Sequence, residues 1–130
     1  MAANTSPIFE LTITSKGQQF TSADTTTKKN IQTGGANGSR VDMLYVSTND
    51  TTAVNLAFYI NDGSTDFYIG NVNVPIGAGY TTVARIEAMK TLAPDLGYLV
   101  LPSGHILKCN CVATMTAAKT TDVLAQGGDY

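Results

Sequence analysis

The stretch from Asn55 to Pro75, NLAFYINDGSTDFYIGNVNVP, constrains this chain of 130 residues more than any other part of the sequence. Two runs rich in β-branched and aromatic residues flank the dipeptide Asp62-Gly63, which is a strong signal of a β-hairpin in such a setting. Pro75 ends the second run, because proline cannot donate a hydrogen bond to a sheet ladder. We therefore predict a hairpin of two antiparallel strands over residues 53–60 and 65–74.

The predicted hairpin carries apolar side chains on both of its faces. In the first strand Leu56 and Phe58 share one parity and Tyr59 has the other. In the second strand Phe67 and Ile69 share the parity opposite to that of the valines near its end. Since successive side chains of a strand point to opposite faces, one face must build a core. The other face is either covered inside the protein or meets another molecule, and both interpretations stay open at this point.

The rest of the chain is rich in strand patterns and turns that contain Gly and Asn, and poor in helix patterns. Further strands are expected over residues 9–13, 25–33, 40–48, 98–102, 105–115 and 120–126. The first of them alternates between apolar and polar residues, which predicts a half-buried strand with its apolar side inward. A turn is expected at Ser15–Gly17. The segment Thr81–Leu92 alone has apolar residues at helical spacing, and Pro94 would end a helix there. We predict an all-β fold, an antiparallel β-sandwich (jelly-roll-like) of about eight strands, with at most one short helix near residues 82–92.

The length fits one domain, which we place at residues 8–126. Residues 1–7 are expected to form a flexible N-terminal arm, and residues 127–130 a loose C-terminal tail. A chain of this size buries roughly two thirds of its unfolded surface, so it needs neither a metal nor a disulfide to fold. Matching parity along consecutive strands predicts the following core residues: Leu44, Val46, Leu56, Phe58, Ile60, Val72, Val74, Leu107 and Cys109.

The composition argues against several classes of function. Charged residues make up 14% of the chain, whereas an average soluble protein has roughly 25%. The net charge is −2 and the densest basic cluster is Lys28-Lys29, so we expect no nucleic-acid partner. No apolar run approaches 18 residues, so we expect no membrane partner. The first ten residues, MAANTSPIFE, lack the pattern of a secretion signal, which predicts synthesis in a cytoplasm without a signal peptide.

The sharpest metal-like cluster consists of His105, Cys109 and Cys111, which share one parity of one strand. Zinc takes four ligands, or three and a water molecule. Ligands strung along a single strand from residue 105 to residue 111 span about 20 Å, which is too far for them to converge on one ion. A disulfide within Cys-Asn-Cys on a strand would be strained. We therefore predict no metal site and two reduced, buried thiols.

Signals of catalysis are equally weak. His105 is the only histidine, and no G-x-S-x-G motif is present for a nucleophile elbow. The acidic residues lie mostly in predicted turns, where aspartate usually caps its own backbone. The loop GGANGS, residues 34–39, lacks the Lys-Ser/Thr and the following helix of a phosphate-binding loop. We expect no catalytic residues, no cofactor and no enzymatic activity.

Three segments together resemble a known class of proteins. They are the run Gly35–Gly79 (GANGSRVDMLYVSTNDTTAVNLAFYINDGSTDFYIGNVNVPIGAG), the motif LPSGHILKC and the ending TTDVLAQGGDY. They resemble the head decoration (cement) proteins of tailed bacteriophages and similar small virion structural proteins, over most of Gly35 to Tyr130. The resemblance implies a β-sandwich that self-associates, often as a trimer, and sits on a capsid lattice. It implies no enzymatic activity.

These expectations combine into one hypothesis with two open alternatives. The protein would be located in the virion, at the capsid surface, with a homo-oligomer of itself (a trimer) and the phage major capsid protein as partners. The candidate interface comprises Tyr59, Phe67, Ile69, Pro7, Ile8 and Tyr130. One alternative is a phage tail or baseplate accessory protein with the same sandwich. The other is a carbohydrate-binding module, which would normally expose Trp or Tyr platforms, and this chain has no Trp.

Overall fold

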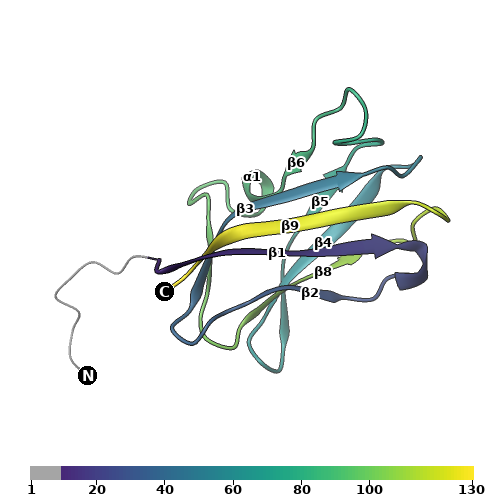
Figure 1. Cartoon of the computed structure of the whole chain (residues 1–130). Helices are drawn as coiled ribbons and strands as arrows, with labels where there is room; N and C mark the ends of the chain where they lie inside the picture. The colour runs from purple at the N-terminus through teal and green to yellow at the C-terminus, as the bar shows by residue number, and fades with distance from the viewer. Residues whose placement is uncertain (1–9) are drawn as a thin grey trace, which may run out of the picture.

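A computed structural model describes residues 10–130 as two antiparallel sheets packed face to face (Figure 1). The large sheet contains β1 (Thr12–Thr21), β9 (Thr120–Asp129), β3 (Ser39–Thr48), β6 (Ile86–Glu87) and β7 (Leu99–Leu101). The small sheet contains β2 (Lys29–Thr33), β8 (Ile106–Cys111), β4 (Val54–Asn61) and β5 (Asp66–Val74). Two single turns of helix, η1 (Ser22–Asp24) and α1 (Met89–Leu92), complete the fold. Within residues 10–130 the predicted all-β sandwich is confirmed, with nine strands and with α1 inside the predicted range.

The strand order is that of a jelly roll. Strands pair as β1 with β9, β2 with β8, β3 with β6 and β7, and β4 with β5, so early strands pair with late ones. The ladders between β3 and β9 and between β4 and β8 then join these ribbons within each sheet. Figure 1 shows β3, β9 and β1 side by side, with the small sheet behind them.

The core lies between the two sheets and matches the predicted set. Eight of the nine predicted residues are buried, and Ile60 is half-buried and packs against the others. Phe20, near the end of β1, and Phe58, in the middle of β4, are the largest fully buried side chains. The inward-facing residues of both sheets therefore form one continuous core, as alternation along each strand predicts.

Two strands run further than the sequence predicted. β1 includes Ser15–Gly17, where we expected a turn, and it pairs with β9 without interruption from Thr12 to Thr21. β9 continues to Asp129, so the expected loose tail at residues 127–130 is wrong for all but its last residue. A Cβ atom on Gly127 would lie 1.8 Å from the Arg40 carbonyl oxygen. Glycine is therefore the residue that allows β9 to approach β3 this closely. The predicted arm, residues 1–7, lies outside the described residues.

The segment with helical spacing forms only one turn of helix. Ile86 and Glu87 instead make the short strand β6 against β3, and the Glu87 Oε1 accepts a hydrogen bond of 2.7 Å from the Leu44 backbone N–H. α1 follows, is anchored by the buried Met89, and ends two residues before Pro94. Neither short helix within residues 10–130 has the length and apolar character needed to cross a bilayer.

Candidate functional site

A β-bulge in the hairpin redistributes the side chains that the sequence assigned to a second apolar face. The β4–β5 register passes from Phe58 opposite Gly70 to Tyr59 opposite Tyr68, so Ile69 is the extra residue of β5. Ile69 is half-buried and packs against the core. A bulge shifts the parity of a strand by one residue, and for this reason Ile69 does not share a face with Tyr59 as the alternation had indicated.

The remaining aromatic residues of the hairpin separate as well. Tyr59 lies beside Tyr68, with ring centroids 5.8 Å apart in an edge contact, and the Lys28 ammonium lies 4.0 Å from the centroid of the Tyr59 ring. Tyr59 is half-buried as a result, whereas Tyr68 is 59% exposed. Phe67 is opposite Ile60, hence on the core side of the sheet, at the end of the edge strand β5, and is 54% exposed.

Polar contacts within the chain surround Tyr59. The Asp66 carboxylate accepts hydrogen bonds from Asn61 (2.7 Å) and Lys28 (2.9 Å), and the Lys108 ammonium lies 3.6 Å from it. The hydrogen bond from Asn61, followed by the one from Lys28, holds the pKa of Asp66 below its usual value. The same lysine thus pairs with Asp66 and covers the Tyr59 ring. The carboxylate and the ring therefore both have partners within the chain.

Of the predicted interface residues at the two chain ends, the structure describes only Tyr130. Pro7 and Ile8 lie outside the described residues. Tyr130 is half-buried, and its backbone N–H donates a hydrogen bond of 3.1 Å to the Gly38 carbonyl oxygen in the loop before β3. Tyr130 therefore belongs to the large sheet, whereas Tyr59 belongs to the small one. Within residues 10–130, the structure does not bring Tyr59, Phe67, Ile69 and Tyr130 into one patch.

The outer face of the large sheet carries apolar side chains that sequence reasoning missed. Ile13 of β1, Met43 of β3 and Leu124 of β9 all point outward and are exposed. A shallow hollow of about 240 Å³ lies between Ile13 and Met43, across Gln126 and Gly127. The alternation of Leu11 and Ile13 with polar residues was visible in the sequence. This pattern does not show which side of the strand faces the core, and we expected the apolar side to be buried.

The most buried carboxylate, Asp50, joins two loops at one end of the sandwich. It is 1% exposed, and its oxygens accept hydrogen bonds from the backbone N–H and the hydroxyl group of both Thr52 and Thr116, at 2.6–3.1 Å. Burial by itself would raise the pKa of Asp50, but the hydrogen bonds from Thr116 and Thr52 outweigh it and lower this pKa to about 2. Asp50 is therefore an ionised clamp between the β3–β4 and β8–β9 connections.

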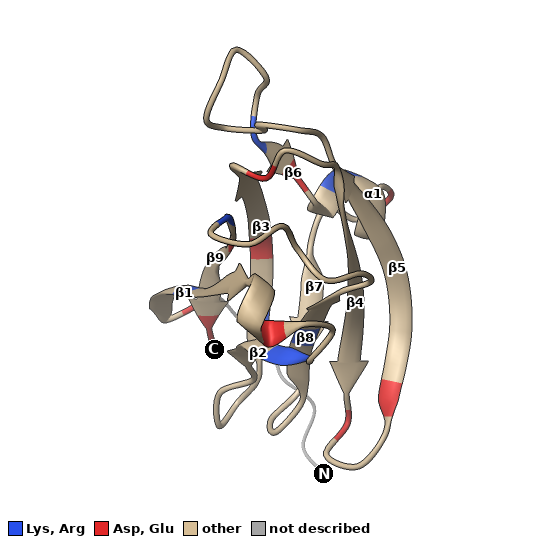
Figure 2. Ribbon diagram, turned by 90° about the vertical axis from the view of Figure 1, so that its right-hand side faces the viewer, with Lys and Arg blue, Asp and Glu red and all other residues tan. Residues whose placement is uncertain are grey.

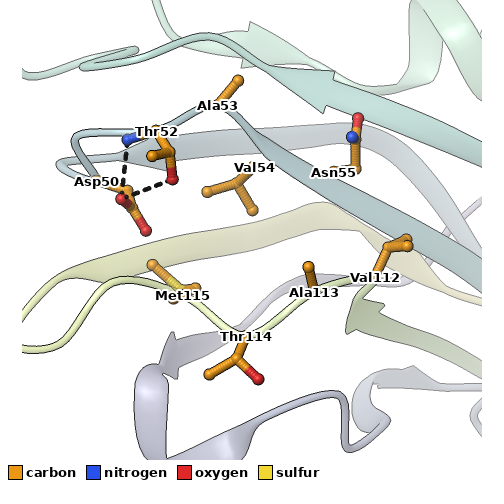
Figure 3. Close-up of a pocket in the computed structure, with 9 residues that line it drawn as sticks. All are labelled: Asp50, Thr52, Ala53, Val54, Asn55, Val112, Ala113, Thr114 and Met115. Atoms are coloured by element: carbon orange, nitrogen blue, oxygen red, sulfur yellow. Dashed lines mark hydrogen bonds between the residues drawn. The ribbon is translucent and has the colours of Figure 1, made fainter.

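A cavity of about 110 Å³ lies next to this clamp. Figure 3 shows Asp50 and Thr52 at one end of it, with Met115 opposite and Val112 and Asn55 at the far end. The carboxylate oxygens of Asp50 are already engaged by four donors from the two loops. A buried anion with satisfied acceptors is a structural element, so this arrangement gives no general base or ligand for catalysis.

The residues of the metal-like cluster lie along β8 and at its start, as predicted. Cys109 and Cys111 are buried and unbridged. Burial raises the pKa of the Cys109 thiol well above its usual value, and burial is also the main cause that raises the pKa of Cys111 to about 11. Within residues 10–130, no three His, Cys, Asp or Glu side chains gather closely enough to hold a metal ion. The thiols pack as small apolar side chains of the core.

The surface charge is sparse and locally paired. Figure 2 shows the charged residues scattered over the strands, with most of the chain uncharged. Lys28 and Lys108 share Asp66, Lys29 pairs with Asp24, and Arg40 lies between Glu10 and Asp42. Half of the eight Lys and Arg residues, all of which lie within residues 10–130, therefore have an acidic neighbour.

Comparison with known proteins gives no relative for this chain. No protein-family model matches it, and neither the curated proteins nor the solved structures contain a significant match.

Proposed function

We propose that this protein is a non-enzymatic structural protein of a virion, a decoration or cement protein that binds the outer surface of a tailed-phage capsid and stabilises it. The observation that carries the proposal is the contrast between the exposed apolar groups and the buried reactive groups. Five of the twelve exposed large hydrophobic side chains of residues 10–130 lie on the large sheet or next to it, whereas the buried carboxylate and thiols have structural roles. Such a molecule is equipped to pack against neighbours, not to transform a substrate.

The exposed apolar groups set the scale of the expected contact. Monomeric soluble proteins rarely expose contiguous apolar patches larger than a few hundred Å². Covering Ile13, Met43 and Leu124 would contribute about 25 cal/mol for each Å² removed from water, before the entropy cost of association. In the proposal, a second copy of the chain and the major capsid protein supply this cover. The trimer is the form that the resemblance to decoration proteins implies.

The fold agrees with the proposal only at the level of analogy. Jelly rolls occur in viral capsid proteins, and they also occur in lectins and in enzymes. Because one fold hosts many functions, the argument rests on the surface residues and on the sequence resemblance.

The test is the copy number of the protein in particles of the virus that encodes it. A decoration protein is present in hundreds of copies and remains with capsids from which the tails have been removed. It also cosediments with empty capsids that lack it, and raises the temperature at which those capsids open. A few dozen copies that leave with the tail would replace the proposal with the tail or baseplate role. Absence from the particle would overturn both.

A further inference from the structure

The loop GGANGS between β2 and β3, residues 34–39, contains the only Asn-Gly pair of the sequence, Asn37-Gly38. An asparagine followed by glycine can react within the chain, because the backbone nitrogen of glycine reaches the asparagine side chain without hindrance from a Cβ atom. Asparagine is for this reason among the thermally labile residues of proteins. Asn37 is exposed and Gly38 is buried. The loop therefore holds a reactive pair of residues at the surface of the protein.

In the folded loop the nucleophile of this reaction is occupied. The Gly38 N–H donates a hydrogen bond of 3.0 Å to the Gly35 carbonyl oxygen, which closes a turn with Asn37 as its third residue. The Gly38 carbonyl oxygen accepts a hydrogen bond of 3.1 Å from the Tyr130 backbone N–H. Gly38 has a φ of 92°, a conformation that favours glycine. Both backbone polar groups of Gly38 are thus held in place by hydrogen bonds within the chain.

A second set of contacts fixes the loop to the end of β9. Ser39, the first residue of β3, is fully buried. Its hydroxyl group accepts a hydrogen bond of 2.8 Å from the Gly35 N–H and donates one to the Asp129 carboxylate. Figure 1 places the β2–β3 loop and the end of β9 at the same end of the sandwich. The loop therefore opens only when its hydrogen bonds to the end of β9 also break.

We propose that Asn37 is a site of self-modification, which the folded loop holds back and which reacts when the loop opens. The Gly38 nitrogen then attacks the Asn37 Cγ atom and forms a C–N bond. The bond from Cγ to Nδ2 breaks, and the proton of the Gly38 N–H leaves with the Nδ2 group as ammonia. Water opens the resulting succinimide ring at either of its two C–N bonds. One product is aspartate, and the other is isoaspartate, in which the backbone runs through the former side chain.

The main products do not fit the closed loop. The succinimide nitrogen carries no proton, so the hydrogen bond to the Gly35 carbonyl oxygen is lost. Isoaspartate adds one carbon atom to the backbone directly before Gly38, where space is short. Even a Cβ atom on Gly38 would lie 3.3 Å from the Leu101 carbonyl oxygen. We expect a chain with isoaspartate at position 37 to keep the sandwich and to lose the contact between Gly38 and Tyr130, so that the modification records a past opening of the loop.

Peptide mapping of the protein at mildly alkaline pH, folded and in urea, tests the reaction. In urea Asn37 should convert faster than any other asparagine of the chain, with release of ammonia, and Gly38→Ala should slow this conversion. In the folded protein the conversion should be at least about tenfold slower, because only the fraction with an open loop reacts. Equal rates in the two states, or no conversion of Asn37 in urea, would overturn the proposal.

Two variants that each remove a buried hydroxyl group separate opening of the loop from unfolding of the whole protein. Ser39→Ala removes the hydroxyl group that joins Gly35 to Asp129. Thr121→Val is the matched control, because the Thr121 hydroxyl donates a buried hydrogen bond of 2.9 Å to Thr48 at the other end of the β3–β9 ladder. In the folded protein, Ser39→Ala should convert Asn37 severalfold faster than the wild type does, and Thr121→Val should not. Equal increases in the two variants would refute the role of the loop.

Hydrogen exchange of the refolded products tests the structural consequence. Chains with isoaspartate at position 37 should lose protection of the Tyr130 N–H, because the longer backbone displaces the Gly38 carbonyl oxygen. Asn37→Asp introduces the same charge without the additional carbon atom, and it should retain the protection. Equal protection in both proteins would show that the modified loop still closes, which would overturn this part of the proposal. None of these measurements involves a capsid, so they are independent of the proposed function.

Discussion

The outer faces of the two sheets differ in how their side chains are satisfied. On the small sheet, Lys28 covers the Tyr59 ring and pairs with Asp66, and Asn73 donates a hydrogen bond of 3.0 Å to Asn55. On the large sheet Arg85 likewise covers the Tyr45 ring, at 3.8 Å from its centroid, but Ile13 projects outward and is 92% exposed, on the edge strand β1. The outer face of the small sheet, which looked apolar in the sequence, is covered at Tyr59 and leaves Tyr68 exposed. The apolar side of β1, which we expected to be buried, is exposed at Ile13.

The difference teaches that aromatic residues on a strand do not by themselves identify an interface. Tyr59 has the residue type expected at protein interfaces. A cation 4.0 Å from its ring centroid satisfies the π-face within the monomer. Ile13 is an ordinary aliphatic residue, and its exposure follows only from the pairing of β1 with β9. Whether a side chain is covered within the monomer or left exposed depends on what it contacts in the fold, and the residue type alone does not show this.

Adjacent residues of β4 give the largest expected contrast between the inner and outer sides of the small sheet. Phe58 is fully buried, and Phe58→Ala should cost about 3–5 kcal/mol in the free energy of unfolding, because a cavity remains in the core. Tyr59→Ala removes a half-buried ring and an exposed cation–π contact, and should cost about 1 kcal/mol. Urea unfolding of both variants measures the difference. Similar losses for the two variants would show that the outer face contributes as much packing as the core.

Sequence reasoning succeeded where a local signal and the global fold agreed. The hairpin is an example, since Asp62 accepts hydrogen bonds from the backbone N–H groups of Ser64 and Thr65, and Gly63 adopts a φ of 109° that favours glycine. The inward parity of Leu56 and Phe58 likewise predicted the core correctly.

It failed where tertiary pairing overrode a local signal. Ser15–Gly17 has the composition of a turn, but it lies in the middle of ten continuous pairs between β1 and β9, which hold it in an extended strand. Gly127 also looked like part of a loose tail, and it is required because the Arg40 carbonyl occupies the place of a side chain. The bulge at Ile69 had no visible sequence signal, and it alone separates the aromatic residues that alternation had grouped. A candidate surface inferred from parity is therefore only as reliable as the assumption of unbroken strands.

The second contrast concerns the acid sensitivity of the two carboxylates Asp50 and Asp62. Asp50→Asn should destabilise the protein by about 2–3 kcal/mol at neutral pH, because Asn cannot accept all the hydrogen bonds that Thr52 and Thr116 donate. The pKa of Asp50 is lowered from 3.8 to about 2 in the folded protein. Its contribution is therefore fully present above pH 4, and is lost as the pH falls through 4 toward 2, by about 2 kcal/mol.

The measurement is the free energy of unfolding between pH 7 and pH 2 for the wild type, Asp50→Asn and Asp62→Asn. Asp62 is the matched control, since it caps an exposed turn, where an Asn side chain can also accept the backbone hydrogen bonds. The Asp50→Asn curve should be the flatter of the two variants below pH 4. If Asp62→Asn is the more destabilised variant, the hairpin turn of the small sheet and not the clamp between the loops is the critical polar contact.

The smallest expected effect concerns the inner face of the small sheet, on which Cys109 and Cys111 lie. Neither EDTA nor a reductant should change the melting temperature, because the two thiols are unbridged and pack as apolar groups. With a pKa of about 11 for Cys111, roughly one thiol in a thousand is ionised at pH 8, so a thiol reagent should react with the native protein far more slowly than in urea. A native rate close to the rate in urea would mean that the β4–β8 ladder opens readily. The small sheet would then be the less stable of the two sheets, although the side chains of its outer face have more partners within the chain.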